Sequence, residues 1–330
     1  MIAQNIALVA GGFTGEYEVS INSARNIKNC LDAAKYKVYT ILITRDSWFY
    51  EENGKRFEID KNDFSLTING EKISFKFAFI TIHGTPGEDG KMQGYFDMLG
   101  IRYNTCDATT SAITMNKAYT KAIVAGIHGL HSARSIQLFK GDAHDMAAIA
   151  GRLRFPLFIK PNNGGSSVGM SKVHNVAGLH DAFERAFKED HQVLVEEFIK
   201  GREFSIGIAR LDGHIKVLPP TEIITKKEFF DYEAKYTAGA SEEITPADLP
   251  AEKLTEIGEI VTEAYLRLNC KGMVRIDFIL LEGTNEFYFI EVNTTPGQSS
   301  ASLIPQQVRA IGMDVGYFYG KLIEGAMSGH

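Results

Sequence analysis

Short apolar runs and one amphipathic stretch follow each other near the start of the chain. The run at 6–10 is apolar at every position and ends in two glycines, which is typical of a buried parallel strand that enters a loop. Residues 20–31 carry apolar side chains at helical spacing, and 36–43 and 75–82 are two further strand-like runs. Strand, helix and strand in this order predict an α/β sheet at the N-terminus.

The rest of the chain predicts further units of mixed structure. The polar stretch at 109–151 is predicted to be rich in helix. Strands are predicted at 155–159, 193–195 and 204–209. The runs 273–281 and 286–292 predict a β-hairpin around the turn at 282–285, and 305–327 predicts helix with a break near Gly312. Because neither repeats nor low-complexity linkers interrupt the chain, we expect three subdomains around one cleft, with boundaries at 1–107, 108–195 and 196–330.

Composition narrows the class of protein. A chain of 330 residues is too long for one ordinary domain, and 44% hydrophobic with 23% charged residues is typical of a soluble globular protein. The net charge of -6, without a basic stripe, argues against a nucleic-acid partner. No apolar run reaches the ~20 residues of a membrane span. The first ten residues are interpreted as a strand and not as a signal peptide, and three scattered cysteines fit the reducing cytoplasm.

A glycine-rich segment follows the strand predicted at 155–159. Lys160 leaves this strand and is followed by Pro-Asn-Asn-Gly-Gly-Ser-Ser-Val-Gly. Glycines allow backbone N–H groups to converge on an anion, and a lysine supplies a point charge for phosphate. The order of residues is not that of a Walker A loop. An ordinary flexible loop is the alternative that this segment alone leaves open.

Acidic residues gather on the predicted hairpin. Alternation places Arg275 and Asp277 on one face of its first strand, and Glu291 and Asn293 on one face of the second. If the strands pair in register, two carboxylates and an amide oxygen converge, which suits Mg²⁺ beside nucleotide phosphates. The alternative is a solvated strand face with cross-strand ion pairs.

Four other segments offer substrate contacts. Gly297 in the turn after the hairpin can present its backbone N–H, and Ser302 precedes a predicted helix, where it either meets a carboxylate or only caps the helix. Glu16 follows the first glycine turn and can hold an ammonium, or be an exposed loop residue. His83 is either a core residue or lies beside substrate. The long polar stretch at 225–250 predicts a lid, with a surface loop as the alternative.

Taken together, these segments resemble the D-alanine–D-alanine ligase family of the ATP-grasp fold. The resemblance covers nearly the whole chain in the family's order. The matching texts are GGFTGEYEVS (11–20), HGTPGEDGKMQGYFDMLG (83–100), MNK (115–117), KPNNGGSSVGMSKV (160–173), EEF (196–198), GREFS (201–205), DYEAKY (231–236), RIDF (275–278), EVNTTPG (291–297) and SLIP (302–305). The resemblance implies an α/β fold with an α+β C-terminal part: an N-terminal parallel-sheet, Rossmann-like substrate domain followed by central and C-terminal ATP-grasp subdomains.

The resemblance also implies roles for individual residues. Those implied to bind ATP are Lys117, Lys160 and Lys235 at the phosphates, Glu196 at the adenine amino group, Glu197 and Phe198 in the hinge, and Glu203 at the ribose. Those implied to hold two Mg²⁺ ions, or Mn²⁺, are Asp277, Glu291 and Asn293. Those implied to bind substrate are Glu16 and His83 at the first D-alanine, Arg275 and the Gly297 N–H at the oxyanion, and Ser302 and Leu303 at the second carboxylate. Ser166 is implied to link Glu16 to Tyr236 and close the lid.

The activity that the resemblance implies is ATP-dependent joining of two D-alanines through an acyl phosphate, for peptidoglycan synthesis, by a homodimer. The alternatives are a D-alanyl-D-lactate enzyme or another ATP-grasp carboxylate–amine ligase, and a nucleotide-binding regulator without catalysis. An NAD-binding dehydrogenase is disfavoured because no G-x-G-x-x-G follows the first strand. Gln298 and Ala301 depart from the Met and His usual in the family, and both are expected to flank the second-substrate pocket.

Overall fold

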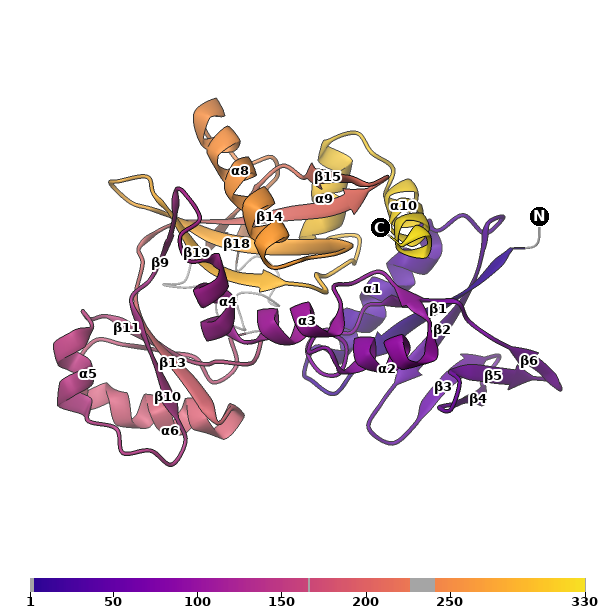
Figure 1. The fold of residues 1–330 in the computed structure, drawn as a ribbon, viewed down its shortest axis with the longest axis horizontal. Helices are drawn as coiled ribbons and strands as arrows, with labels where there is room; N and C mark the ends of the chain where they lie inside the picture. The colour runs from indigo at the N-terminus through magenta and orange to yellow at the C-terminus, as the bar shows by residue number, and fades with distance from the viewer. Residues whose placement is uncertain (1–2, 166, 226–240, 330) are drawn as a thin grey trace.

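The computed structural model describes residues 3–165, 167–225 and 241–329, and its strands form three sheets (Figure 1). The first sheet has the strand order β6-β5-β4-β3-β2-β1-β7-β8. Its parallel strands are β1 (Gln4–Gly11), β2 (Tyr36–Ile43), β7 (Phe77–Ile80) and β8 (Arg102–Tyr103). Its antiparallel strands are β3 (Trp48–Glu52), β4 (Lys55–Asp60), β5 (Ser65–Ile68) and β6 (Glu71–Ile73). The predicted N-terminal α/β sheet is confirmed, and the antiparallel strands extend it.

Helices cover both faces of the first sheet. On one face, α1 (Tyr17–Cys30) and the C-terminal helix α10 (Val315–Ser328) share a core with Ile6 and Leu8. On the other face, α2 (Lys91–Leu99) packs against β1 and its neighbours. In Figure 1 the yellow α10 accordingly lies beside the indigo β1 and α1. A strand buried on both faces exposes no side chain, and this explains the uninterrupted apolar run of β1.

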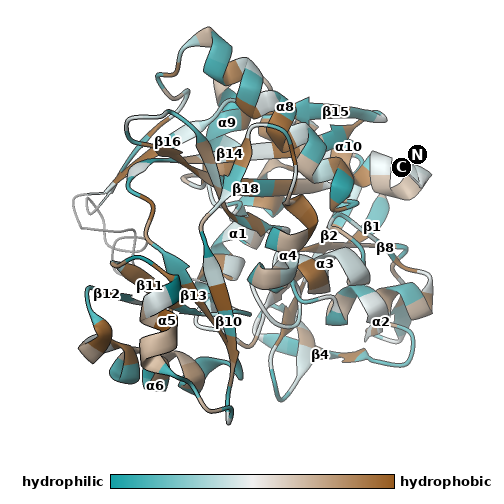
Figure 2. Cartoon of the chain, turned by 60° about the vertical axis from the view of Figure 1, so that its left-hand side comes forward, coloured by the Kyte–Doolittle hydropathy of each residue, from teal (hydrophilic) through white to brown (hydrophobic). Residues whose placement is uncertain are grey.

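The second sheet is antiparallel and has the order β10-β13-β11-β12. These strands are β10 (Ser135–Phe139), β13 (Gln192–Glu197), β11 (Leu157–Pro161) and β12 (Ser171–Val173). The helical elements beside them are α5 (Met146–Arg152), the 3₁₀ turn η1 (Val176–Gly178) and α6 (Leu179–Glu189). The buried residues of α6 are spaced at three and four, and they form one core with the apolar residues of β11 and β13. Figure 2 shows the mixed hydropathy expected of an amphipathic helix along α6.

The third sheet carries the predicted hairpin at its centre, in the order β17-β16-β14-β18-β19-β9, with β15 paired to β14. Its strands are β9 (Leu130–Ser132), β14 (Gly201–Leu211), β15 (His214–Val217), β16 (Thr221–Thr225), β17 (Ser241–Ile244), β18 (Met273–Leu281) and β19 (Phe287–Asn293). The hairpin prediction is confirmed in its register, because Arg275 pairs with Asn293 and Asp277 pairs with Glu291. An irregularity between Asp277 and Phe278 shifts the register beyond this point.

The stretch at 109–151 is rich in helix, as predicted, but it also contains strands. It contains the helices α3 (Ala108–Met115), α4 (Lys117–Val124) and α5, but also the strands β9 and β10. β9 pairs in parallel with β19, which lies far along the sequence, so its conformation depends on a partner that its own three residues do not reveal. The helices α3 and α4, together with α8 (Ala251–Arg267), lie at the third sheet.

The C-terminal helical prediction is confirmed. The helix α9 (Leu303–Ala310) ends shortly before Gly312, whose positive φ of 71° breaks the chain direction, and α10 begins three residues later. All three cysteines have free thiols. Within the described ranges, no helix combines the length and the apolar character that crossing a membrane requires.

Candidate active site

A cavity of about 640 Å³ is walled by loops and strands of all three sheets. The sequence-predicted residues that line it are Glu16, His83, Lys117, Lys160, Glu196, Glu197, Glu203, Arg275, Asp277, Glu291, Asn293, Gly297, Ser302 and Leu303. Phe198 is not among the lining residues. Ser166, Lys235 and Tyr236 lie outside the described residues. Residues predicted from segments nearly 300 positions apart therefore share one cavity.

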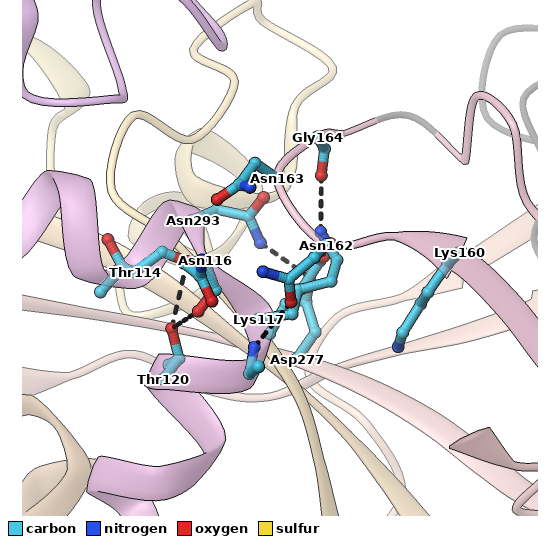
Figure 3. A network of polar contacts seen from close by, with 12 residues as sticks. Thr114, Asn116, Lys117, Thr120, Lys160, Asn162, Asn163, Gly164, Asp277 and Asn293 are labelled. Carbon is cyan, nitrogen blue, oxygen red and sulfur yellow. Dashed lines mark hydrogen bonds and ion pairs between the residues drawn. The ribbon is translucent and has the colours of Figure 1, made fainter. Parts of the chain in front are cut away.

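The centre of the cavity is a hydrogen-bonded group on neighbouring strands. Arg275 donates a hydrogen bond to each carboxylate oxygen of Asp277, one from Nε and one from Nη2. Both bonds are 2.9 Å long. Asp277 also accepts a bond from Ser205 Oγ at 2.6 Å and one from Asn293 Nδ2 at 3.0 Å, the latter drawn in Figure 3. Ser205 lies opposite Asp277 on β14, and sequence reasoning missed it because the pairing of β14 with β18 is long-range.

Arg275 is surrounded by negatively charged side chains. Burial by itself lowers the pKa of its guanidinium, but Asp277, and then Glu291 and Glu88, raise it well above its usual value. Within the described residues, the hydrogen bonds of Arg275 to Asp277 use two of the five N–H groups that a guanidinium carries. Arg275 is thus a permanent cation on the cavity wall with donors left for a ligand.

The predicted metal ligands come together on adjacent strands. Glu291 lies opposite Asp277 in the hairpin, and Asn293 donates to the Asp277 carboxylate. Two carboxylates and an amide are a hard-oxygen donor set that fits Mg²⁺ or Mn²⁺, although Asn293 must turn its amide to present oxygen. Among the described residues, no group of three or more His, Cys, Asp or Glu side chains is arranged to hold a metal, so a site here depends on Asn293.

The glycine-rich loop after β11 is tied to the start of α4 (Figure 3). The Lys117 N–H donates to Asn162 O at 3.1 Å, and the Ala118 N–H donates to Asn162 Oδ1 at 2.9 Å. The Lys117 ammonium donates to Gly164 O at 2.5 Å and lies 3.4 Å from Glu291 Oε2. The part of the loop that is described is therefore anchored, and an anion entering the cavity beside it meets a lysine ammonium.

The carboxylate of Glu196 lies between two lysines. It forms ion pairs with Lys160 on β11 and with Lys121 on α4. Burial alone would raise the pKa of Glu196, but the two ammonium groups lower it below its usual value. Sequence reasoning assigned roles to Glu196 and Lys160 and missed Lys121, which lies one helical turn after Lys117 and carried no motif of its own.

The predicted hinge residues have different environments. Strand alternation turns the Glu197 carboxylate away from that of Glu196, and it accepts bonds from the Arg154 N–H at 3.0 Å and from Arg154 Nη2 at 3.1 Å. The Phe198 ring packs edge-on to Phe158 with 5.5 Å between ring centroids. Phe158 lines the cavity whereas Phe198 does not, so Phe198 contributes to the wall from behind.

Glu16 and His83 lie at the end of the cavity nearest the first sheet. His83 is 7% exposed, and its Nε2 atom has no hydrogen-bond partner in the described part of the protein. Burial lowers the pKa of His83; Glu16 opposes this effect, and Arg275 adds to it. The imidazole is therefore favoured in its neutral form, beside a carboxylate that can hold an ammonium.

Glu88 is a further cavity residue that the sequence did not identify. Its carboxylate accepts the Gly84 N–H at 3.0 Å and the Thr295 N–H at 3.1 Å, and so joins the loop after β7 to the turn after β19. Burial raises the pKa of Glu88 to about 7, with the backbone N–H groups acting in the opposite direction. The signal available in the sequence was a carboxylate in the loop that contains His83.

We expect Glu88 to make the stability of the protein depend on pH. Between the ordinary pKa of 4.5 and the raised value of about 7, the folded protein holds a proton on Glu88 that the unfolded chain releases. The free energy of unfolding should then fall as pH rises through this window, by at most about 3 kcal/mol. Denaturation at about pH 5 and about pH 8 measures the fall, which Glu88→Gln should remove. An equal fall in the wild type and the variant would contradict the prediction.

The turn after β19 leads to Ser302 at the start of α9. Ser302 stands at the N-cap position, but its hydroxyl makes no cap hydrogen bond. It accepts the Ser299 N–H at 3.0 Å and lies 2.8 Å from Ser299 Oγ. Simple helix capping is therefore excluded as the role of this hydroxyl, and Ser299, which sequence reasoning missed, fixes its position on the cavity wall.

Gln298 and Ala301, the two residues that differ from those usual in the family, lie in different environments. Ala301 lines the cavity as expected. Gln298 is 1% exposed and is absent from the lining residues; its N–H donates to Ser23 Oγ at 3.0 Å, and Tyr319 Oη donates to its side chain at 3.0 Å. Gln298 thus ties the turn to α1 and α10, and its own side chain does not line the cavity, whereas its neighbours Gly297 and Ser299 do.

Comparisons with known proteins agree with this geometry. Two family models match, described as D-ala D-ala ligase N-terminus at residues 5–106 and D-ala D-ala ligase C-terminus at residues 129–324. A protein named D-alanine--D-alanine ligase from Flavobacterium johnsoniae is 44% identical over 322 residues, with 97% of this chain and 98% of the relative covered. One of the same name from Parabacteroides distasonis is 44% identical over 314 residues, with 94% of each covered.

Solved structures show the same likeness. The VanG D-Ala:D-Ser ligase from Enterococcus faecalis superposes with a TM-score of 0.87 at 32% identity, covering 98% of this chain and 99% of that one. The D-alanine--D-alanine ligase from Bacillus anthracis complexed with ATP superposes with a TM-score of 0.79 at 31% identity, covering 99% and 98%. Both comparisons extend over all three sheets.

Proposed function

The chain belongs to the D-alanine–D-alanine ligase family, and from this premise we propose how its cavity joins two D-alanine molecules with ATP. The protein has the ATP-grasp fold, and it is an ATP-dependent ligase that forms D-alanyl-D-alanine for peptidoglycan synthesis. The observation that carries the proposed site is the charged group at the cavity centre. There Arg275 forms two hydrogen bonds to Asp277, beside Glu291 and Asn293. Glu16 and Ser302 line the same cavity.

In the first step, the carboxylate of one D-alanine attacks the γ-phosphate of ATP and forms an acyl phosphate, while the bond to the β-phosphate breaks and ADP leaves. Glu16 holds the ammonium of this D-alanine, beside neutral His83, so that its carboxylate points toward Arg275. Lys117 and Lys160 bind the phosphates, and Glu203 holds the ribose. Asp277, Glu291 and Asn293 would hold Mg²⁺, which neutralises charge on the transferring phosphate when bound. Lys235 completes this set and lies outside the described residues.

In the second step, the amine of the other D-alanine attacks the acyl carbonyl and phosphate leaves. The carbonyl oxygen becomes negative, and the remaining donors of Arg275 with the Gly297 N–H face it. Ser302 and Leu303 hold the carboxylate of the incoming D-alanine. Because the acyl group is activated on phosphate, the reaction needs no covalent bond to the protein.

The choice of second substrate is tested directly. The protein is incubated with ATP, Mg²⁺ and D-alanine, alone or with D-serine, D-lactate or L-alanine, and phosphate and product mass are measured. Phosphate release with D-alanyl-D-alanine as the main product supports the proposal. The VanG neighbour is a D-Ala:D-Ser ligase, so a product formed only with D-serine or D-lactate would retain the fold and refute the proposed substrate.

We expect Gly297→Ala to damage the second substrate site. An added Cβ would lie 2.9 Å from Ser302 Oγ, closer than such atoms pack, and would displace the hydroxyl. The KM for the second D-alanine should rise roughly tenfold or more, while ATP binding is unchanged. Gly258→Ala on α8, where nothing lies within 4 Å of the added Cβ, is the matched control. Equal KM values in the two variants would contradict the assignment of the Ser302 hydroxyl to the second D-alanine.

Four broader expectations stay predictions. We propose that Ser166 and Tyr236 belong to a lid over the cavity, and that the boundaries at 107 and 195 divide the chain into substrate, central and C-terminal units. We also propose that the enzyme acts in the cytoplasm as a homodimer. Partial proteolysis with and without ATP, and light scattering, test the lid and the oligomeric state.

A further inference from the structure

One buried carboxylate at the cavity wall is shared by two lysines. Glu196 on β13 pairs with Lys121 from α4 and with Lys160 from β11. The side chains of all three are nearly removed from solvent, with exposed fractions of 10%, 9% and 13% in that order. A single carboxylate needs only one cation for neutrality, so the second lysine calls for an explanation.

The two lysines differ in their other contacts. Lys121 Nζ also donates to Ala133 O at 2.8 Å and to Ser135 Oγ at 3.0 Å, so its three N–H groups each have an acceptor. Lys160 lines the cavity, whereas Lys121 is not among the residues that line it. Lys121 is therefore held inside the protein, behind the cavity lining, and Lys160 is within reach of a ligand.

We propose that Lys121 is a positioning residue for the nucleotide: it keeps the Glu196 carboxylate charged and oriented when Lys160 leaves it for the phosphates of ATP. This inference rests on the proposed function, in which Lys160 binds phosphate and Glu196 accepts a hydrogen bond from the adenine amino group. A buried carboxylate that loses its sole cation is strongly disfavoured. Without Lys121, Glu196 would hold Lys160 back or take up a proton, and either change removes a nucleotide contact.

The inference also predicts base selectivity. A charged Glu196 accepts from the amino group of adenine and repels the carbonyl oxygen that guanine carries at the same position. Loss of Lys121 should therefore weaken ATP more than GTP. Because Lys121 is not on the cavity wall, it should affect nucleotide affinity and leave the chemical step intact.

The test is ADP binding by calorimetry to the full chain, in the absence of D-alanine. Lys121→Met and Lys121→Gln should weaken ADP binding at least about tenfold, and Lys121→Arg should restore most of it. The KM for ATP should rise in Lys121→Met and Lys121→Gln, while their kcat at saturating ATP stays within roughly threefold of the wild type. Lys140→Met is the matched control, since Lys140 donates to Phe187 O at 2.9 Å outside the cavity.

A double variant identifies the route of the effect. In a Glu196→Gln background, Lys121→Met should weaken ADP binding by less than about twofold more, because the partner through which it acts is already changed. Wild-type affinity in Lys121→Met and Lys121→Gln would overturn the inference, as would a full additional loss in the Glu196→Gln background. Since the binding assay contains no D-alanine, a failure of the proposed ligation would appear in the product assay and not here.

Discussion

Replacing Arg275 with alanine is expected to lower kcat roughly 10²–10³-fold while ADP binding is largely retained. Its guanidinium forms a two-point ion pair with Asp277 at the centre of the cavity. Its remaining N–H donors are assigned to the oxyanion of the second step. Removing it also leaves Asp277 buried without its cation, which costs about 3–5 kcal/mol of stability. Product formation under saturating ATP and D-alanine measures the effect, and the melting temperature is recorded in parallel.

Arg275→Lys separates charge from geometry, because an ammonium keeps the positive charge but cannot form the planar fork. The Arg275→Lys variant should be more stable than Arg275→Ala, but its kcat should still be low. Arg202→Ala is the matched control. Arg202 lies on the same sheet and forms the same two-bond arrangement with Glu222, with both hydrogen bonds 2.7 Å long. Neither Arg202 nor Glu222 is among the residues that line the cavity. Turnover by Arg275→Ala within tenfold of the control would rule out the oxyanion role.

Glu291→Gln is expected to lower kcat at least about 10²-fold at ordinary Mg²⁺ and to raise the Mg²⁺ concentration needed for half-maximal rate. The substitution keeps the size of the side chain and removes one of the two carboxylates of the donor set. The donors that remain are the neutral amide of Asn293 and the Asp277 carboxylate, whose negative charge is already partly neutralised by Arg275. The measurement is the rate as a function of Mg²⁺ and, separately, of Mn²⁺.

Glu286→Gln provides the control from the same hairpin. Glu286 accepts a bond from Thr284 Oγ1 at 3.0 Å at the exposed turn, and its loss should leave the Mg²⁺ dependence unchanged. If Glu291→Gln showed the wild-type Mg²⁺ dependence, Glu291 would not be a metal ligand. Its remaining role would then be the contact with Lys117 at 3.4 Å.

The site residues that the sequence identified correctly as neighbours belong to patterns of short range. Alternation alone put Arg275 with Asp277 and Glu291 with Asn293, and the turn between the two runs set the hairpin register that pairs them. The same short-range patterns predicted β1, β2 and the break between α9 and α10. The convergence of these residues with Glu16 and Lys160 in one cavity was implied only by the family resemblance, because no local pattern contains it.

Lys121, Ser205, Glu88 and Ser299 were missed for a common reason. Each acquires its importance from a partner distant in sequence or from a local fold that no pattern predicts, as Glu88 does by accepting the Thr295 N–H from the turn after β19. The same dependence on distant partners buries the Gln298 side chain against α1 and α10, and it gives part of the stretch at 109–151 strand conformation.

The sequence by itself determined several elements, among them β1, β2 and the hairpin, and, through its family motifs, the chemistry of this ligase. Only the tertiary structure decided which charged side chains meet. Glu196 pairs with two lysines, and Asp277 is hydrogen-bonded to Arg275. The pKa of Glu88 is raised to about 7 by burial. The physical reason is that periodicity reports how a segment is buried, whereas the charge state of a buried group depends on its desolvation and on the groups that meet it in space.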